Sequence, residues 1–182
     1  MKILKGNLRG RNLVCPAHIR PVSMRVKKSC FDILSGQFKS AHVLDLFAGS
    51  GALGIEAISQ GAATAVFVDI KKSCIDAIKK NLLRLKLLPQ AKAYLKDAAV
   101  AVKDCYLRRR KFDFIFIDPP YYEGMLIKTL QILEEHDILA PSGYIVGFCY
   151  IKDDFLKESS KFLLVEHRKY GQSQLLIYTK NE

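Results

Sequence analysis

The sequence lacks the long apolar segments and the leader peptide that mark membrane and secreted proteins. Its longest apolar stretch, Tyr144–Ile151, is interrupted by Gly147 and is far too short to cross a bilayer. The opening residues MKILKGNLRGRN spread four positive charges and contain no apolar core of the kind that a signal peptide needs. We therefore expect a soluble protein of the cytoplasm with no membrane partner.

Cysteine and histidine are too scattered to suggest disulfides or metal binding. The five cysteines are odd in number and never occur as C-x-x-C, and three of them lie in apolar periodic segments, where a free cysteine behaves as a small hydrophobic residue. The four histidines are equally dispersed. We expect a reducing compartment and no metal site.

Acidic residues are almost absent from the first 40 residues, where Asp32 is the only one. The whole chain has a net charge of +11, and this segment holds nine of its cations: Lys2, Lys5, Arg9, Arg11, Arg20, Arg25, Lys27, Lys28 and Lys39. A solvated face is the ordinary fate of such residues, but a concentrated excess of one sign attracts polyanions. We interpret residues 1–40 as a basic arm that contacts nucleic acid.

The arm itself has two predicted elements. Weak alternation of apolar residues around Gly6 and Gly10 predicts a short hairpin within residues 1–15. Ser23 is a plausible helix N-cap, and the apolar residues after it, up to Phe38, fall near helical spacing. We expect one amphipathic helix to close the arm.

From residue 41 to residue 182, short apolar runs alternate with helical patterns. Strands are expected at Val43–Phe47, Thr64–Asp69, Ala91–Leu95, Phe112–Ile117, Tyr144–Tyr150, Phe162–Arg168 and Ser173–Thr179. Helices are expected at Gly51–Gln60, Lys71–Leu87, Ala98–Tyr106 and Glu123–His136. This alternation predicts an α/β fold with a mostly parallel, Rossmann-like sheet of seven strands, and the short connection Lys169–Gln172 makes the last two strands an antiparallel hairpin. Such sheets bind ligands beyond the carboxyl ends of their strands.

The stretch LDLFAGSGALGIEA, residues 44–57, forms the exit of the first strand and contains a G-x-G-x-x-G turn. Asp45, Phe47, Gly49 and Gly51 belong to this exit and turn. Taken alone, the glycine pattern fits either a nucleotide-binding loop or a simple tight turn between a strand and a helix. A pyrophosphate would be repelled by Asp45 by about 1–4 kcal/mol, depending on the dielectric. S-adenosylmethionine carries an ammonium and a sulfonium, so Asp45 favours this cofactor over a dinucleotide.

Two further acidic residues end strands on the same edge. Asp69 ends the second strand, where a carboxylate can accept hydrogen bonds from both ribose hydroxyls of a nucleoside. Asp97 follows the third strand, where the adenine amino group would lie. An N-cap for the helix at Ala98–Tyr106 is an equally good interpretation of Asp97.

The motif Asp118-Pro-Pro-Tyr121 follows the apolar run Phe114–Ile117. A stiff turn is the alternative interpretation, but a turn needs neither two prolines nor an aromatic ring. An exocyclic amine is a poor nucleophile because its lone pair is delocalised into the ring. Asp118 and the Pro119 carbonyl can accept its two hydrogens, Pro119 and Pro120 fix the backbone, and Tyr121 can stack on a flipped base. We expect methyl transfer to a base amine.

These motifs together resemble a known family, the RsmD-like methyltransferases of bacterial 16S ribosomal RNA, which modify the N2 amino group of guanine 966. The resemblance covers nearly the whole chain. LRGRNL and RPVSMRVKKSCFDIL are similar to the family's arm, LDLFAGSGALGIEA to its cofactor loop, FIFIDPPY to its catalytic turn and KYGQSQLLIY to its closing hairpin. Many amine methyltransferases share the cofactor and catalytic motifs, so the arm carries the argument for this family.

The resemblance implies guanine-N2 methylation of 16S rRNA with S-adenosylmethionine as the methyl donor. The partner is expected to be this RNA or the small ribosomal subunit, and the protein is expected to act as a monomer. The implied cofactor residues are Asp45, Gly49, Gly51, Asp69 and Asp97, the base would lie at Asp118–Tyr121, and the arginines that match the family's arm are Arg9, Arg11, Arg20 and Arg25. The family usually has Thr at the position of Val22 and Glu at the positions of Lys28 and Asp69.

Other functions remain open from the sequence. The same DPPY motif could serve adenine N6 or cytosine N4 in DNA or in another RNA, although a DNA enzyme would usually need an extra target-recognition region. A dehydrogenase is disfavoured by Asp45 and by the lack of a second domain for the substrate. A non-catalytic RNA-binding protein that uses the basic arm is disfavoured by the intact DPPY motif.

Overall fold

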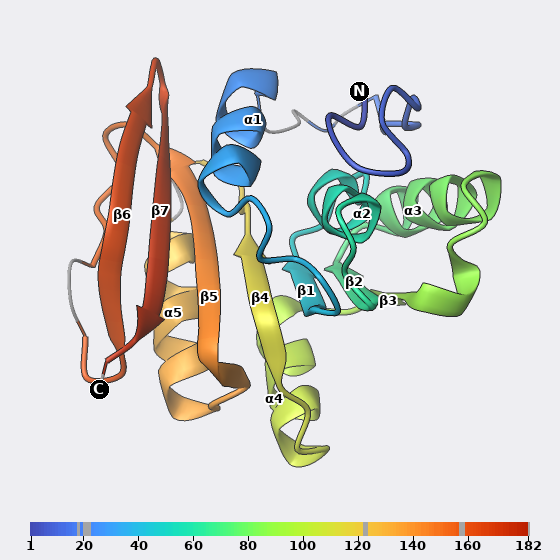
Figure 1. Ribbon diagram of the computed structural model, residues 1–182. Coiled ribbons are helices and arrows are strands. Elements are labelled where there is room, and N and C mark those ends of the chain that lie inside the picture. The colour runs from blue at the N-terminus through green and yellow to red at the C-terminus, as the bar shows by residue number, and fades with distance from the viewer. Residues whose placement is uncertain (18, 20–22, 122–123, 157–158, 182) are drawn as a thin grey trace.

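The computed structural model describes residues 1–17, 19, 23–121, 124–156 and 159–181 and is built around a seven-stranded sheet (Figure 1). The strand order is β3-β2-β1-β4-β5-β7-β6. The strands are β1 (His42–Leu46), β2 (Thr64–Asp69), β3 (Ala91–Leu95), β4 (Phe112–Ile117), β5 (Leu139–Tyr150), β6 (Phe162–Tyr170) and β7 (Ser173–Lys180). Neighbours among β1 to β5 are parallel, whereas β7 is antiparallel to both β5 and β6. The predicted sheet is confirmed.

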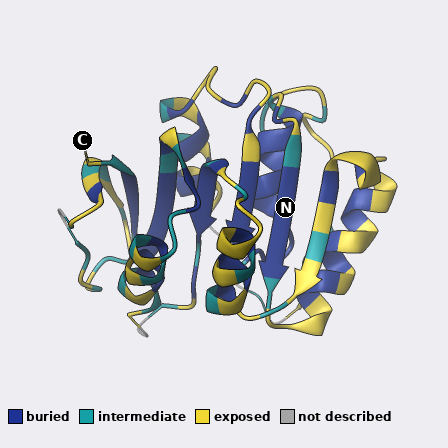
Figure 2. Cartoon of the chain, turned by 90° about the horizontal axis from the view of Figure 1, so that it is seen from below, coloured by how far each residue is buried: buried dark blue, intermediate teal, exposed yellow. Residues whose placement is uncertain are grey.

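Helices cover both faces of this sheet. They are α1 (Met24–Ile33), α2 (Ala52–Ser59), α3 (Lys72–Arg84), α4 (Ala98–Leu107) and α5 (Met125–Glu135), with a 3₁₀ turn, η1, at Leu88–Gln90. Alternate strand residues point to opposite faces, so the continuous apolar runs of β2 and β4 supply two cores. Phe67 and Phe114 pack with α1, α2 and α3, while Val68 and Ile115 pack with α4 and α5. Figure 2 shows the inner strands buried and the outer sides of the helices exposed.

The helix of the arm is shorter than the sequence predicted. It begins after Ser23, whose side chain caps it as expected, but it ends at Ile33. The following turn contains Gly36 in the left-handed region, with φ of +83°. Phe38 packs beyond this turn against Phe31 and Phe114, with ring centroids 5.1 and 4.4 Å apart. Its helical spacing therefore reflects burial in the same core, not continuation of the helix.

Other boundaries differ from the predictions by small amounts. The hairpin expected in residues 1–15 contains a single antiparallel bridge, between Lys2 and Asn12. Strand β5 begins earlier than predicted, at Leu139. Helix α5 begins after Gly124, which has a φ of +60°, and the predicted start at Glu123 lies outside the described residues.

The arm is attached to the sheet domain by buried polar side chains of α2. Glu56 accepts hydrogen bonds from the backbone N–H groups of Leu4 at 2.9 Å and Lys5 at 2.8 Å. The same carboxylate forms an ion pair of 2.7 Å with Lys27 of α1, and both charged side chains are fully buried. Burial lowers the pKa of Lys27, and the Glu56 carboxylate opposes this shift. Breaking one partner of such a pair leaves an uncompensated buried charge, so the arm is firmly held.

Two more side chains extend this attachment. Ser59, near the end of α2, accepts a hydrogen bond from the N–H of Leu8 and donates one to the carbonyl of Lys5. Asn81 of α3 accepts from the N–H of Val14 at 2.8 Å and donates to the Val14 carbonyl at 2.9 Å.

Within the described residues, no helix has the length and apolar character needed to cross a membrane.

Candidate active site

A cleft of about 570 Å³ opens at the carboxyl ends of the parallel strands. The residues that follow β1, β2, β3 and β4 all contribute to it, as expected for an open α/β sheet. Its lining contains nine of the ten predicted cofactor and catalytic residues: Asp45, Phe47, Gly49, Asp69, Asp97, Asp118, Pro119, Pro120 and Tyr121. The tenth, Gly51, is the N-cap of α2, and its neighbours Ser50 and Ala52 on either side line the cleft.

The backbone between β1 and α2 is strained and tightly packed. Phe47 has a φ of +61°, which is rare for a bulky residue and is the kind of strain that surrounding structure must hold in place. Gly49 and Gly51 also have positive φ values, +56° and +78°, which glycine adopts readily. Gly54 serves a different purpose, because a Cβ there would lie 2.4 Å from the ring of Phe67. The first two glycines therefore shape the loop, and the third lets α2 approach β2.

Asp45 lies buried at the base of this loop. One carboxylate oxygen, Oδ2, accepts a hydrogen bond from the N–H of Gly54 at 3.0 Å. The other, Oδ1, is buried and has no hydrogen-bond partner among the described residues. Burial raises the pKa of Asp45 well above its usual range; the Gly54 hydrogen bond opposes this, and the nearby Asp118 and Asp69 add to it. A cationic ligand in the cleft would satisfy this oxygen and stabilise its charge.

Asp69 and Asp97 hold local backbone while they face the cleft. Asp69 accepts hydrogen bonds from the N–H of Gly49 at 2.9 Å and from the N–H of Lys71 at 2.8 Å, so it clamps the glycine loop to the end of β2. Asp97 caps α4 by accepting from the N–H of Ala99 at 2.8 Å. The capping interpretation of Asp97 is therefore correct, and the same residue also lines the cleft. Capping uses only its Oδ1.

The catalytic turn closes the cleft after β4. Asp118 is half-buried, Pro119 is buried and Pro120 is exposed. Burial raises the pKa of Asp118 to about 7, so the carboxyl changes between its neutral and ionised forms near neutral pH. The hydroxyl of Tyr121 makes a hydrogen bond of 2.8 Å with the Ser173 hydroxyl at the start of β7, and its ring lies 5.9 Å from that of Tyr150. The position of Tyr121 is thus set by the closing hairpin, a contact that the local sequence pattern did not indicate.

Several lining residues were not singled out from the sequence. The arm contributes Ile19 and Lys27, and the loops after β2 and β3 contribute Ile70 and Lys96. Ile70 is 68% exposed, a large apolar side chain at the edge of the cleft. A signal for Lys27 did exist: it stands at helical spacing from Cys30, Phe31 and Leu34, on the apolar side of α1.

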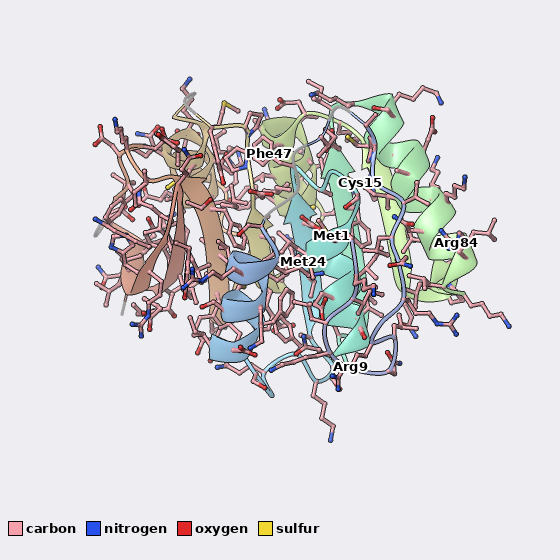
Figure 3. The ribbon with its side chains drawn as sticks, turned by 90° about the horizontal axis from the view of Figure 1, so that it is seen from above. Met1, Arg9, Cys15, Met24, Phe47 and Arg84 are labelled. Atoms are coloured by element: carbon pink, nitrogen blue, oxygen red, sulfur yellow. The ribbon has the colours of Figure 1, made fainter. Side chains whose placement is uncertain are left out.

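The arginines predicted to bind RNA do not form one group. Arg25 is exposed on α1, with its guanidinium 6.0 Å from the ring centre of Tyr170. Arg9 and Arg11 lie in the loop that docks on Ser59, at the opposite end of α2 from the glycine turn. Figure 3 shows Arg9 at the far end of the molecule from Phe47. Arg20 lies outside the described residues.

Among the described residues, no group of three or more His, Cys, Asp or Glu side chains is arranged to hold a metal ion. Four of the five cysteines, all except Cys15, are buried, and burial raises the pKa of the Cys30 thiol above its usual range. These thiols pack as small apolar groups.

This fold, with its glycine turn, acidic strand ends and antiparallel closing hairpin, is that of the class I S-adenosylmethionine-dependent methyltransferases. The profile of the family "Conserved hypothetical protein 95" matches residues 1–179, and the chain belongs to that family.

Relatives and solved structures of similar length match the chain from end to end. YlbH of Bacillus subtilis (strain 168) is 35% identical over 182 residues, covering 99% of both chains. "Ribosomal RNA small subunit methyltransferase D" of Escherichia coli (strain K12) is 29% identical, over 99% of this chain and 90% of its own. The solved structure of the methyltransferase yhhF from Escherichia coli superposes with a TM-score of 0.86 at 29% identity, covering 100% of this chain and 98% of the other.

Proposed function

We propose that this protein transfers a methyl group from S-adenosylmethionine to the exocyclic N2 of a guanine in 16S ribosomal RNA. The observation that carries the proposal is that one cleft is lined by both Asp45 and the turn Asp118–Tyr121. Asp45 is buried, and one of its two carboxylate oxygens has no hydrogen-bond partner among the described residues. The first residue suits a cationic cofactor, and the turn suits a planar amine. Relatives named for ribosomal RNA methylation at up to 35% identity support an rRNA substrate, and guanine N2 is our own, finer assignment.

The residues in the cleft fit S-adenosylmethionine, which supplies an electrophilic methyl group on a sulfonium. Asp45 would face the positive charges of its methionine end, because Oδ1 is buried without a partner. Asp69 would accept hydrogen bonds from the ribose, and Asp97 from the adenine amino group. Phe47 and Ile70 supply apolar surface in the same lining.

Asp118 and the backbone of the following prolines would act on the amine. An ionised Asp118 carboxylate accepts one amino hydrogen, and the carbonyl of Pro119 accepts the other, which draws the nitrogen toward a tetrahedral, nucleophilic geometry. A pKa near 7 leaves the Asp118 carboxylate able to take up a proton from the methylated amine. Tyr121 would stack on the flipped guanine, with its hydroxyl held by Ser173.

Residues 1–40 would contact the RNA, and residues 41–182 would carry the chemistry. The arginines of the arm, Arg9, Arg11 and Arg25, and by resemblance Arg20, would bind phosphates. A ribosomal substrate would place the protein in the cytoplasm, and we propose that it acts as a monomer.

A gene-deletion strain and the purified protein test this function together. Ribosomal RNA from the deletion strain should lack one methyl group, which mass spectrometry maps to a guanine. The purified protein should restore that group with labelled S-adenosylmethionine, and digestion should yield N2-methylguanosine. Label found in N6-methyladenosine or N4-methylcytidine would show that the target base is wrong. Labelled RNA would be absent altogether for a non-catalytic RNA-binding protein.

A further inference from the structure

Two elements that the proposed chemistry does not use lie beside the catalytic turn. They are the amino end of α1 and the turn between β6 and β7. Figure 1 shows both at the end of the sheet to which the arrow of β4 points, and Asp118 follows β4 directly. Arg25, Lys169 and Gln172 are exposed there, and Tyr170 is half-buried. Consecutive strand residues point to opposite faces, so Tyr170 faces α1 while Lys169 lies on the other face of the sheet at the same rim. We call these four residues the α1–hairpin surface.

Tyr170 joins the two parts of this surface. Its hydroxyl forms a hydrogen bond with the Ser29 hydroxyl of α1, and its ring lies under the guanidinium of Arg25 at 6.0 Å. A guanidinium that stacks on an aromatic ring keeps its in-plane N–H donors available for a phosphate. Tyr170 therefore holds Arg25 in an orientation that suits an anionic ligand.

Hydrogen bonds and a ring contact also connect the α1–hairpin surface to the catalytic turn. Ser173, the residue after Gln172, holds the hydroxyl of Tyr121 at 2.8 Å. The carbonyl of Gln172 accepts a hydrogen bond from the N–H of Ile151 at 2.9 Å, next to Tyr150, whose ring lies beside Tyr121. A ligand on the α1–hairpin surface would thus lie within a few residues of the group that positions the target base.

The charges around the surface leave two cations available. Lys28 is paired with Asp32 at 2.6 Å, and Arg168 is paired with Glu166 at 2.8 Å. In the parts of the chain that the structure describes, no ion pair involves Arg25 or Lys169. Asp153, an acid on the adjoining loop, accepts a hydrogen bond from the N–H of Tyr150. The surface is therefore cationic next to the cleft.

We propose that the α1–hairpin surface binds the phosphates on either side of the flipped guanine, with Arg25 and Lys169 as the contacts. This inference rests on the proposed function and adds residues of the hairpin to the predicted RNA contacts. Arg9 and Arg11 lie at the other end of α2, which spans about 12 Å. They would therefore contact phosphates farther from the target nucleotide than Arg25 and Lys169 do.

Binding of a short, fluorescein-labelled single-stranded RNA, measured by anisotropy across a salt series, tests the surface. The assay contains S-adenosylhomocysteine, so that no methyl transfer occurs. Arg25→Ala/Lys169→Ala should bind at least about tenfold more weakly, with a salt slope reduced by about 1.4, the value for two phosphate contacts on a single strand. The charge-matched control Lys79→Ala/Lys80→Ala changes two exposed lysines of α3 and should bind like the wild type. Arg9→Ala/Arg11→Ala should weaken binding of long 16S rRNA but not of the short RNA.

The outcomes separate the surface from the general charge of the protein. Equal losses in the α3 control, or wild-type affinity in Arg25→Ala/Lys169→Ala, would overturn the proposal. So would a parallel loss of S-adenosylhomocysteine affinity, which would assign the surface to the cofactor site, or competition by polyglutamate as strong as by RNA, which would indicate an acidic protein partner.

Methyl transfer to 16S rRNA is measured separately to keep the two proposals apart. If the wild type methylates this RNA and the double variant still binds the short RNA tightly, the proposed function stands. The proposal that the α1–hairpin surface binds phosphates is then refuted. A wild-type protein that methylates no RNA refutes the function, while a selective loss of binding in the double variant still supports the surface.

Discussion

The pH dependence of methyl transfer should follow the ionisation of Asp118. Burial raises the pKa of its carboxyl to about 7, so a large part of the ligand-free protein carries a neutral Asp118 at neutral pH. A neutral carboxyl has less acceptor capacity than a carboxylate, because a proton occupies one oxygen. The target amine should therefore be held best above pH 7.

The size of the effect follows from this pKa. For one group that titrates at about 7, the ionised fraction rises from about 1/11 at pH 6 to about 10/11 at pH 8, so kcat/KM should rise roughly tenfold. Asp118→Asn keeps an acceptor oxygen but does not titrate, so its profile should be flat at an intermediate rate. Asp118→Ala should lose most turnover at every pH while it keeps the fold.

Transfer of a labelled methyl group at subsaturating RNA gives kcat/KM for each variant across this pH range. Thermal melting gives a second readout. A carboxyl with a raised pKa stabilises the fold least when ionised, so its contribution is complete below the unfolded pKa of 3.8 and is lost as the pH rises through about 7. Asp118→Asn should therefore gain stability relative to the wild type as the pH rises from about 4 to about 7, and the difference should level off above pH 7. An Asp118→Asn protein that retains the same rise in kcat/KM would refute the assignment.

Three further changes probe the cofactor loop and the arm. Asp69→Ala should weaken S-adenosylmethionine binding by about 1–3 kcal/mol in calorimetry, since Asp69 faces the cleft and also holds the N–H of Gly49; tight binding of NAD by the wild type would contradict the cofactor assignment. Gly54→Ala should destabilise the protein by about 1–3 kcal/mol, because its Cβ would lie 2.4 Å from Phe67, and Phe67→Leu should restore part of the loss; the absence of any rescue would mean that another contact is responsible. Arg9→Glu/Arg11→Glu should flatten the salt dependence of binding to long RNA and leave cofactor affinity nearly unchanged, whereas parallel losses would make the arm part of the cofactor site.

The sheet and the cofactor loop were predictable because their signals are local. β2, β3 and β4 begin and end at the residues that the sequence predicted, since each is a short run bounded by polar residues or turns. The carboxyl ends of parallel strands meet at one edge of a sheet, and this rule requires no knowledge of packing. It was enough to predict that one cleft contains Asp45, Asp69, Asp97 and Asp118. The approximate position of the helices followed in the same way.

Contacts between distant segments were not predictable from these patterns. Ser173 was only the first residue of a strand in the sequence, yet it holds Tyr121, 52 positions away. The nine cations of the arm are close together in the sequence, but they are apart in the structure. Lys27 is buried in the core, and Arg9 and Arg25 lie at different ends of the sheet domain. Periodicity reports which side of a helix is apolar, and it does not report on which part of the sheet that side will rest.

The buried ion pair between Lys27 and Glu56 has a consequence for the order in which the chain folds during synthesis. The arm leaves the ribosome first, but the hydrogen bonds that fix it reach forward 52 residues from Leu4 to Glu56 and 67 residues from Val14 to Asn81. Tyr170, whose hydroxyl forms a hydrogen bond with the Ser29 hydroxyl, comes 141 residues after Ser29. Since translation adds about 5–20 residues per second, Lys27 has no acceptor for seconds, and the last hairpin arrives later still. The segment made first is therefore secured only after α2 and α3 have been made, and a nascent chain stalled before α2 would carry its basic arm unattached.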